Sequence, residues 1–87
     1  MATQVEIEND GSVDKDQVHL KKNQGSIHWK QKQNKNFSVD FVNSPFPDKH
    51  FDQGKPDSGT ATGDVGRYTY TVTVAGISGD PDVIIDA

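Results

Sequence analysis

The side chains best suited to binding a metal ion are three histidines. His19 and His28 fall on the outward face of a predicted β-hairpin. With a two-residue turn they lie opposite each other, their Cβ atoms about 4.5 to 5.5 Å apart, and one copper or zinc ion would reach both. A four-residue turn pairs His19 with Lys30 instead, and the residue pattern fits both registers. His50 is the third candidate ligand, and a second chain would complete the site. Two exposed imidazoles without a third ligand are usually ordinary surface residues, so the metal site is the alternative interpretation.

Nucleophilic catalysis requires a serine hydroxyl beside a histidine and an orienting carboxylate. Ser44 and Ser58 are the candidate nucleophiles, and Asp48 and His50 lie near them in the sequence. The pattern contains no strand-to-helix turn of the kind that exposes a catalytic serine, and the chain has no cysteine. We therefore expect no catalytic residue and no enzymatic activity, and a small hydrolase remains a formal alternative.

Three aspartates near the first predicted turn have side chains that calcium prefers. Asp10, Asp14 and Asp16 lie close together in the sequence and could suggest a calcium site. Their spacing does not fit an EF-hand loop, which also requires a glycine at its sixth position and a glutamate at its twelfth. We expect these carboxylates to stabilise a turn at Asn9–Ser12, and we expect no cofactor.

Length and charge limit the classes of protein that fit. The 87 residues suffice for one domain, residues 1–87, with one modest core. A net charge of −4 disfavours nonspecific binding to nucleic acid. No apolar run approaches the roughly 18 residues of a membrane-spanning helix, and the opening residues 1–4 lack the pattern of a signal peptide. These features predict a soluble monomer or weak oligomer whose compartment the sequence leaves undecided.

Two-residue alternation of apolar and polar side chains predicts an all-β chain. The longest alternating run is 66–74, which we expect to be a central strand with one face formed by Tyr68, Tyr70, Val72 and Val74. Shorter runs predict strands at 5–7, 13–20, 26–31, 37–41 and 82–86. The runs that flank residues 21–25 are interpreted as a hairpin with an inward face formed by Val18, Leu20, Ile27 and Trp29.

Two segments without regular alternation are the predicted recognition loops. The first is the polar loop 31–36, and the second is the long segment 43–64, interrupted by prolines and glycines. A short strand near 60–65 would shorten the second segment, which is either a packed crossover or a functional loop. Phe46 and Phe51 are expected to plug the core; the alternative is an exposed contact patch with Lys49 and His50.

Lysines crowd the region before and within the first loop, at Lys21, Lys22, Lys30, Lys32 and Lys35. A solvated strand face is the expected explanation, and a basic docking patch is the alternative. The candidate interaction residues are therefore Phe46, Lys49, Phe51, Lys30 and Lys32.

Four features together resemble the cupredoxin family of plastocyanin and azurin type. They are an early strand, the run from Val18 to Trp29, the strand 37–41, and the late Gly66-Arg67-Tyr68-Thr69-Tyr70. The resemblance implies a Greek-key sandwich in which two histidines, a cysteine and a methionine hold copper. In this chain Phe37 stands where the first histidine would be and Val72 where the cysteine would be. The segment 74–79 supplies neither histidine nor methionine, and the only methionine is Met1.

Together these patterns predict a single small Greek-key β-sandwich of about seven strands, cupredoxin-like but without a type 1 copper site. The expected function is that of a noncatalytic binding or protein-interaction module for an unidentified protein or small molecule. It would act through the loops at one end or through an edge strand. The alternative function is copper or zinc binding by surface histidines.

Overall fold

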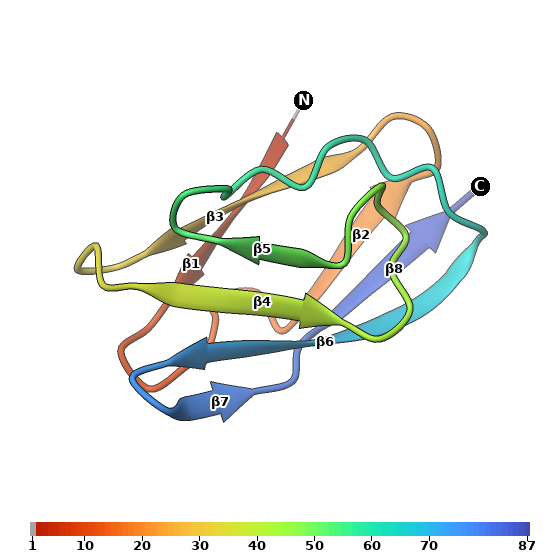
Figure 1. Ribbon diagram of the computed structural model, residues 1–87. Coiled ribbons are helices and arrows are strands. Elements are labelled where there is room, and N and C mark those ends of the chain that lie inside the picture. Colours follow the sequence, from red (N-terminus) through yellow and green to blue (C-terminus); the bar gives the residue numbers. More distant parts are fainter. Residues whose placement is uncertain (1) are drawn as a thin grey trace.

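The protein is described by a computed structural model that covers residues 2–87, so Met1 lies outside the described residues. All of the regular structure in this range is β-strand (Figure 1). The strands are β1 (Ala2–Ile7), β2 (Gln17–Lys21), β3 (Ser26–Gln31), β4 (Phe37–Phe41), β5 (His50–Asp52), β6 (Gly66–Val74), β7 (Ile77–Gly79) and β8 (Asp82–Asp86). No helix capable of crossing a membrane occurs among residues 2–87.

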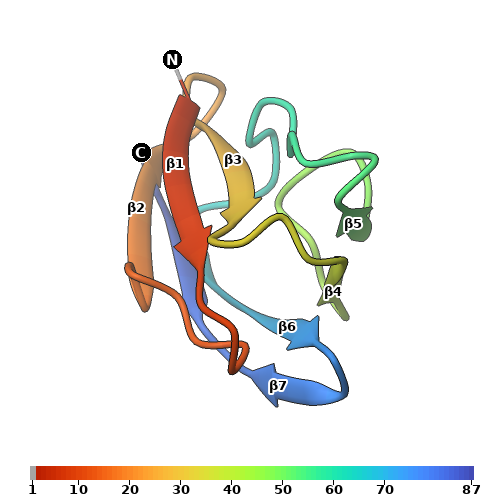
Figure 2. The same ribbon diagram turned by 90° about the vertical axis from the view of Figure 1, so that its left-hand side faces the viewer.

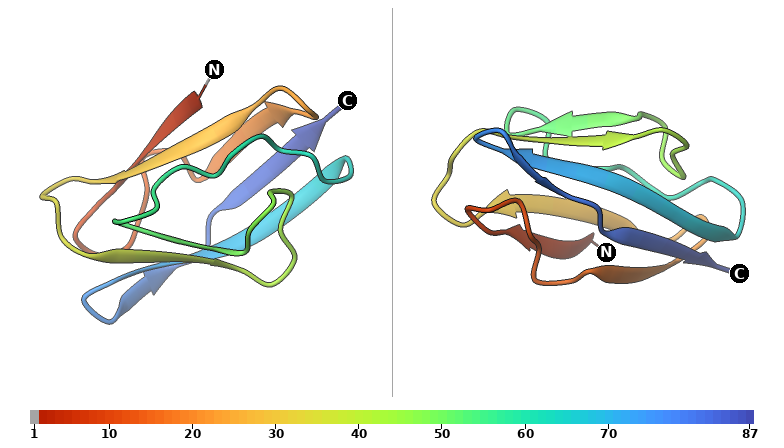
Figure 3. Two further views of the ribbon diagram at one scale, coloured as in Figure 1. Left: turned by 45° about the horizontal axis from the view of Figure 1, so that its top comes forward. Right: turned by 90° about the horizontal axis from the view of Figure 1, so that it is seen from below.

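The strands form two open sheets that pack as a small β-sandwich-like domain. In the smaller sheet β1 pairs with β3 in parallel. The larger sheet has the order β2-β8-β6-β4-β5, and β7 also pairs with β6. Figure 2 shows the larger sheet curving around β1 and β3, and Figure 3 shows the same arrangement from two further sides. The prediction of an all-β chain is confirmed.

The strand β6 occupies the centre of the larger sheet, as its sequence pattern predicts. Its first half pairs with β8, from Gly66 opposite Ile85 to Thr69 opposite Asp82. Its second half pairs with β4, from Tyr70 opposite Phe41 to Val74 opposite Phe37. The four residues predicted to face inward, Tyr68, Tyr70, Val72 and Val74, are all buried.

The predicted hairpin between the second and third strands is wrong. Its four inward residues are buried as expected, but β2 pairs with β8 whereas β3 pairs with β1. The turn between them carries the chain from one sheet to the other, with the Gln24 and Gly25 amides both donating to the Lys21 carbonyl. Alternation specifies which side chains face inward but not which strand is the partner. A hairpin and a turn that crosses between sheets therefore give the same alternating pattern.

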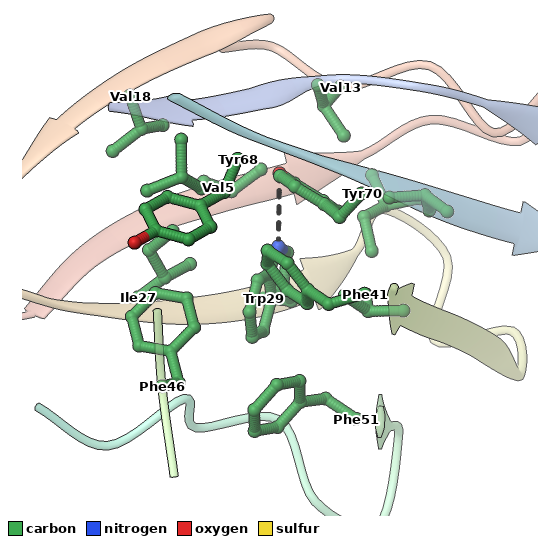
Figure 4. Packing of buried hydrophobic residues seen from close by; sticks show 14 of the residues in the cluster. Val5, Val13, Val18, Ile27, Trp29, Phe41, Phe46, Phe51, Tyr68 and Tyr70 are labelled. Carbon is green, nitrogen blue, oxygen red and sulfur yellow. Dashed lines mark hydrogen bonds between the residues drawn. The ribbon is translucent and has the colours of Figure 1, made fainter. Parts of the chain in front are cut away.

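Aromatic rings from four segments of the chain fill the centre of the core (Figure 4). The Trp29 ring lies 5.0 Å from the Phe51 ring and 5.7 Å from the Tyr70 ring, measured between centroids. Its indole N–H donates to the Tyr70 hydroxyl over 3.3 Å. The tryptophan is therefore the core anchor that its position in the sequence predicts.

The long segment 43–64 is a packed crossover. Phe46 and Phe51 are buried against Trp29, and Phe51 belongs to the short strand β5. No strand forms at 60–65; instead Asp57 bridges to His28 on β3. Of the two interpretations of the phenylalanines, the core plug is the one found, so neither ring is available as an exposed contact patch.

Candidate functional site

The three histidines lie on three different strands, and each ring is hydrogen-bonded to a different aspartate. The Nδ1 atoms of His19, His28 and His50 lie 3.1 Å from Asp86, 2.6 Å from Asp57 and 2.6 Å from Asp40 respectively. Since β2 and β3 belong to different sheets, neither predicted register that brings His19 near His28 or Lys30 is formed. Across residues 2–87, no three histidine or carboxylate side chains are placed to hold one metal ion.

His50 has carboxylates on both sides of its ring. Besides its bond to Asp40, its Nε2 lies 3.4 Å from Asp52. The hydrogen bond to Asp40 is the main cause that raises the pKa of His50, with a smaller contribution from Asp52. When the ring is protonated, the imidazolium donates from Nδ1 to Asp40 and lies in an ion pair with Asp52, and in that state it has no lone pair for a metal ion. This cluster suits a surface ion pair better than a metal site.

The two candidate nucleophilic serines are hydrogen-bonded to the backbone. Ser44 Oγ accepts from the Phe46 amide over 3.0 Å and donates to the Asp48 carbonyl over 2.7 Å. Ser58 is buried, and its Oγ accepts from the Ile27 amide over 2.7 Å. Neither hydroxyl contacts an imidazole, so both serines fix the crossover segment in place.

The aspartates near the first turn form local hydrogen bonds. Asp10 accepts from both the amide and the hydroxyl of Ser12, and these bonds lower the pKa of the Asp10 carboxyl. Asp14 accepts from the Glu6 amide over 2.9 Å and lies 3.0 Å from the Lys15 ammonium. These carboxylates stabilise the turn, as the sequence predicts.

Two adjoining hollows lie between the polar loop 31–36 and the turn that follows β5. One, of about 290 Å³, is lined by residues of β3, of the polar loop and of the turn after β5: His28, Trp29, Lys30, Gln31, Asn34, Phe37, Gln53 and Pro56. The other, of about 420 Å³, shares Phe37 and Gln53 and extends past Asn36 to His50, Asp52 and Gly54. We call the two hollows together the end groove. It lies between the two segments that the sequence predicts as recognition loops.

A buried glutamine shapes one wall of the end groove. The Gln31 side-chain oxygen accepts from the amides of Gln33 and Lys35, each over 2.8 Å, and its amide nitrogen donates to Asn9. Gln53 donates to the Asn34 carbonyl over 2.7 Å and so joins the loop to the turn after β5. Gln31 was missed as a positioning residue, although the alternation of Ile27 and Trp29 places it inward.

The predicted lysines do not form one continuous basic patch. Lys30 lines the end groove, whereas Lys32 lies 3.3 Å from Glu8. Lys49 is exposed just before β5. Lys21 lies on β2 in the larger sheet, whereas Lys30 lies on β3 in the smaller one. Of the candidate interaction residues, Lys30 is therefore the one that the fold brings to the groove.

Fold and groove together define a small β-sandwich-like domain with a shallow cleft of mixed polar and apolar lining. Comparison with known protein families, with characterised proteins and with solved structures found no match.

Proposed function

We propose that this protein is a noncatalytic binding module that holds a small polar ligand, or a side chain of a protein partner, in the end groove. The observation that carries the proposal is the position of the groove, between the polar loop 31–36 and the turn that follows β5, both of which the strands hold in place. Its hollows, about 290 and about 420 Å³, fall near the lower end of the usual range for ligand sites. A single side chain or a ligand of comparable size fits such a volume.

The lining of the groove supports a ligand with both apolar and hydrogen-bonding parts. Phe37 and Pro56 contribute apolar surface, whereas Asn34 and Gln53 contribute amides. The Gln53 amide is already hydrogen-bonded to the Asn34 carbonyl, and that bond holds the rim in shape. A preformed rim lowers the ordering cost of binding, because little of the site has to become fixed when the ligand arrives.

We further propose that the framework is a cupredoxin-like Greek key that has no type 1 copper site. The support comes from the two positions that the family resemblance assigns to copper ligands. Phe37 lies opposite Val74, and Val39 lies opposite Val72, so Phe37 and Val72 are diagonal neighbours on the inner face. Both are buried apolar residues that pack the core. An experimental structure in which β4 and β6 are not neighbours would contradict this assignment.

The groove proposal is tested by screening a fragment library against the ¹⁵N-labelled protein by NMR. Fragments that bind are expected to shift the amide signals of residues 34–37 and 53–56. Gln53→Trp fills the groove from its rim and is expected to abolish these shifts. The matched control is Gln33→Trp, since Gln33 is also an exposed loop glutamine but does not line the groove. Hits that bind Gln53→Trp as well as the parent protein, or that map to other surfaces, would contradict the proposal.

A further inference from the structure

The strand β2 forms one edge of the larger sheet (Figure 2). Its ladder to β8 is bounded by two backbone hydrogen bonds, from the Asp82 amide to the Asp16 carbonyl and from the Lys22 amide to the Asp86 carbonyl. In a parallel ladder with these ends, Val18 and Leu20 bond to β8. The backbone groups of Gln17, His19 and Lys21 therefore point away from the sheet.

The open edge of β2 is accessible and regular. The side chains of Gln17, His19 and Lys21 are exposed, while Val18 and Leu20 between them are buried. No proline or bulge interrupts the strand. An edge of this kind is a template for pairing with another strand.

We propose that a second copy of this chain pairs with β2 in antiparallel orientation about a two-fold axis at His19. This register places Gln17 opposite Lys21 of the second copy and His19 opposite His19. Each residue whose backbone groups point away from the sheet therefore meets a residue of the same kind. Val18 then lies beside Leu20 of the second copy, because the even offset keeps each apolar side chain on the inner face. A shift by two residues in either direction leaves one of the three unpaired.

Charge at the ends of the strand favours a second copy as the occupant. The same register places Asp16 of one chain opposite Lys22 of the other, and the two-fold axis repeats this pair at the opposite end. Among residues 2–87, the one ion pair of Lys22 is a 3.6 Å contact with Asp64, whose side chain is 99% exposed. At the axis each His19 brings its own carboxylate, Asp86, which lies 3.1 Å from the imidazole.

The pairing is expected to be weak. The Lys21 carbonyl already accepts from Gln24 and Gly25, so the flanking residue pairs form fewer bonds than the central one. A contact of one short strand with its copy buries less than the roughly 1,200 Å² typical of stable complexes. We expect a dissociation constant between about 10 µM and about 1 mM.

The dimer is tested by sedimentation equilibrium from about 10 µM to about 2 mM of the full chain, a range that brackets the expected constant. His19→Pro blocks the edge without removing a bond to β8, since the His19 amide points outward. This variant is expected to stay monomeric at every concentration. Circular dichroism and thermal melting confirm that it is folded.

A second set of variants distinguishes the proposed register from other contacts and does not depend on a proline. Asp16→Lys and Lys22→Asp each place like charges opposite each other, and each is expected to raise the dissociation constant roughly tenfold. The double variant restores opposite charges and is expected to restore the parent constant. A parent protein that is monomeric at about 2 mM would overturn the proposal. So would a dimer that survives His19→Pro, or charge variants whose effects add instead of cancelling.

Discussion

Replacing Phe51 by alanine tests whether the crossover segment is part of the core. Phe51 is fully buried and packs edge-on against Phe41 and Phe46, with ring centroids 6.3 and 6.2 Å away. Truncating a buried phenylalanine lowers the free energy of unfolding by about 3 to 5 kcal/mol, from lost burial and the cavity left behind. At the usual stability per residue, the parent chain has roughly 4 to 13 kcal/mol in total. Phe51→Ala is therefore expected to remove a large share of the stability and, at the lower end of this range, to leave the protein unfolded at room temperature.

Urea denaturation followed by Trp29 fluorescence measures this loss, because the indole ring lies 5.0 Å from the Phe51 ring. With a denaturant slope of about 1 to 3 kcal/mol per molar, the midpoint is expected to fall by about 2 M. Phe51→Leu keeps most of the volume and is expected to cost about 1.5 kcal/mol, so a measurable transition remains. A loss of less than about 1 kcal/mol for Phe51→Ala would contradict the packed crossover, because it would mean that the Phe51 ring is exposed in solution.

Three further predictions concern protonation and backbone conformation. The hydrogen bond to Asp40 raises the pKa of His50, so this bond stabilises the fold fully below pH 6.5, and the stabilisation is lost as the pH rises through the pKa of the folded state. An NMR titration should place the titration midpoint of His50 above 6.5, and Asp40→Asn should lower that midpoint. Burial raises the pKa of Tyr70 from 10.0 to about 12, so the free energy of unfolding should fall between these pH values more steeply than in Tyr70→Phe. Gly11→Ala should destabilise more than Gly76→Ala, since both have positive φ but a Cβ at Gly11 would lie 2.8 Å from the Ile77 carbonyl oxygen; thermal melting compares the two, and equal losses would show that the close contact relaxes.

Side-chain periodicity predicted the faces of the long strands and failed where pairing had to be inferred. Tyr70 and Val72 were assigned to the inner face of a central strand and are buried there. The turn at residues 22–25 reads as a hairpin because it is short, yet it joins different sheets. No local sequence pattern around residues 17–31 predicts where β8 lies, and β8 is the strand that pairs with β2.

Short strands and polar core residues carry too little local signal to be predicted in the same way. The strand β5 has three residues and one buried side chain, Phe51, so it shows no alternation. Gln31 occupies an inward position, but its role depends on Asn9 and on loop amides that the fold brings to it. His19 was assigned to an outward face and is exposed, whereas His28, assigned to the same kind of face, is half-buried. The pairing of His28 with Asp57, 29 residues further along the chain, depends on the crossover.

The position of the apolar residues restricts where this protein can act. Phe37 on β4 and Val72 on β6 occupy inner positions, and both are buried. The interior is filled with packed side chains, and the two proposals place recognition at the rim of the end groove and at the free edge of β2. These two surfaces differ in mechanism, since one offers side-chain amides and the other backbone groups. Gln53→Trp is therefore expected to leave self-association unchanged, and His19→Pro to leave fragment binding unchanged, so each proposal can fail without the other.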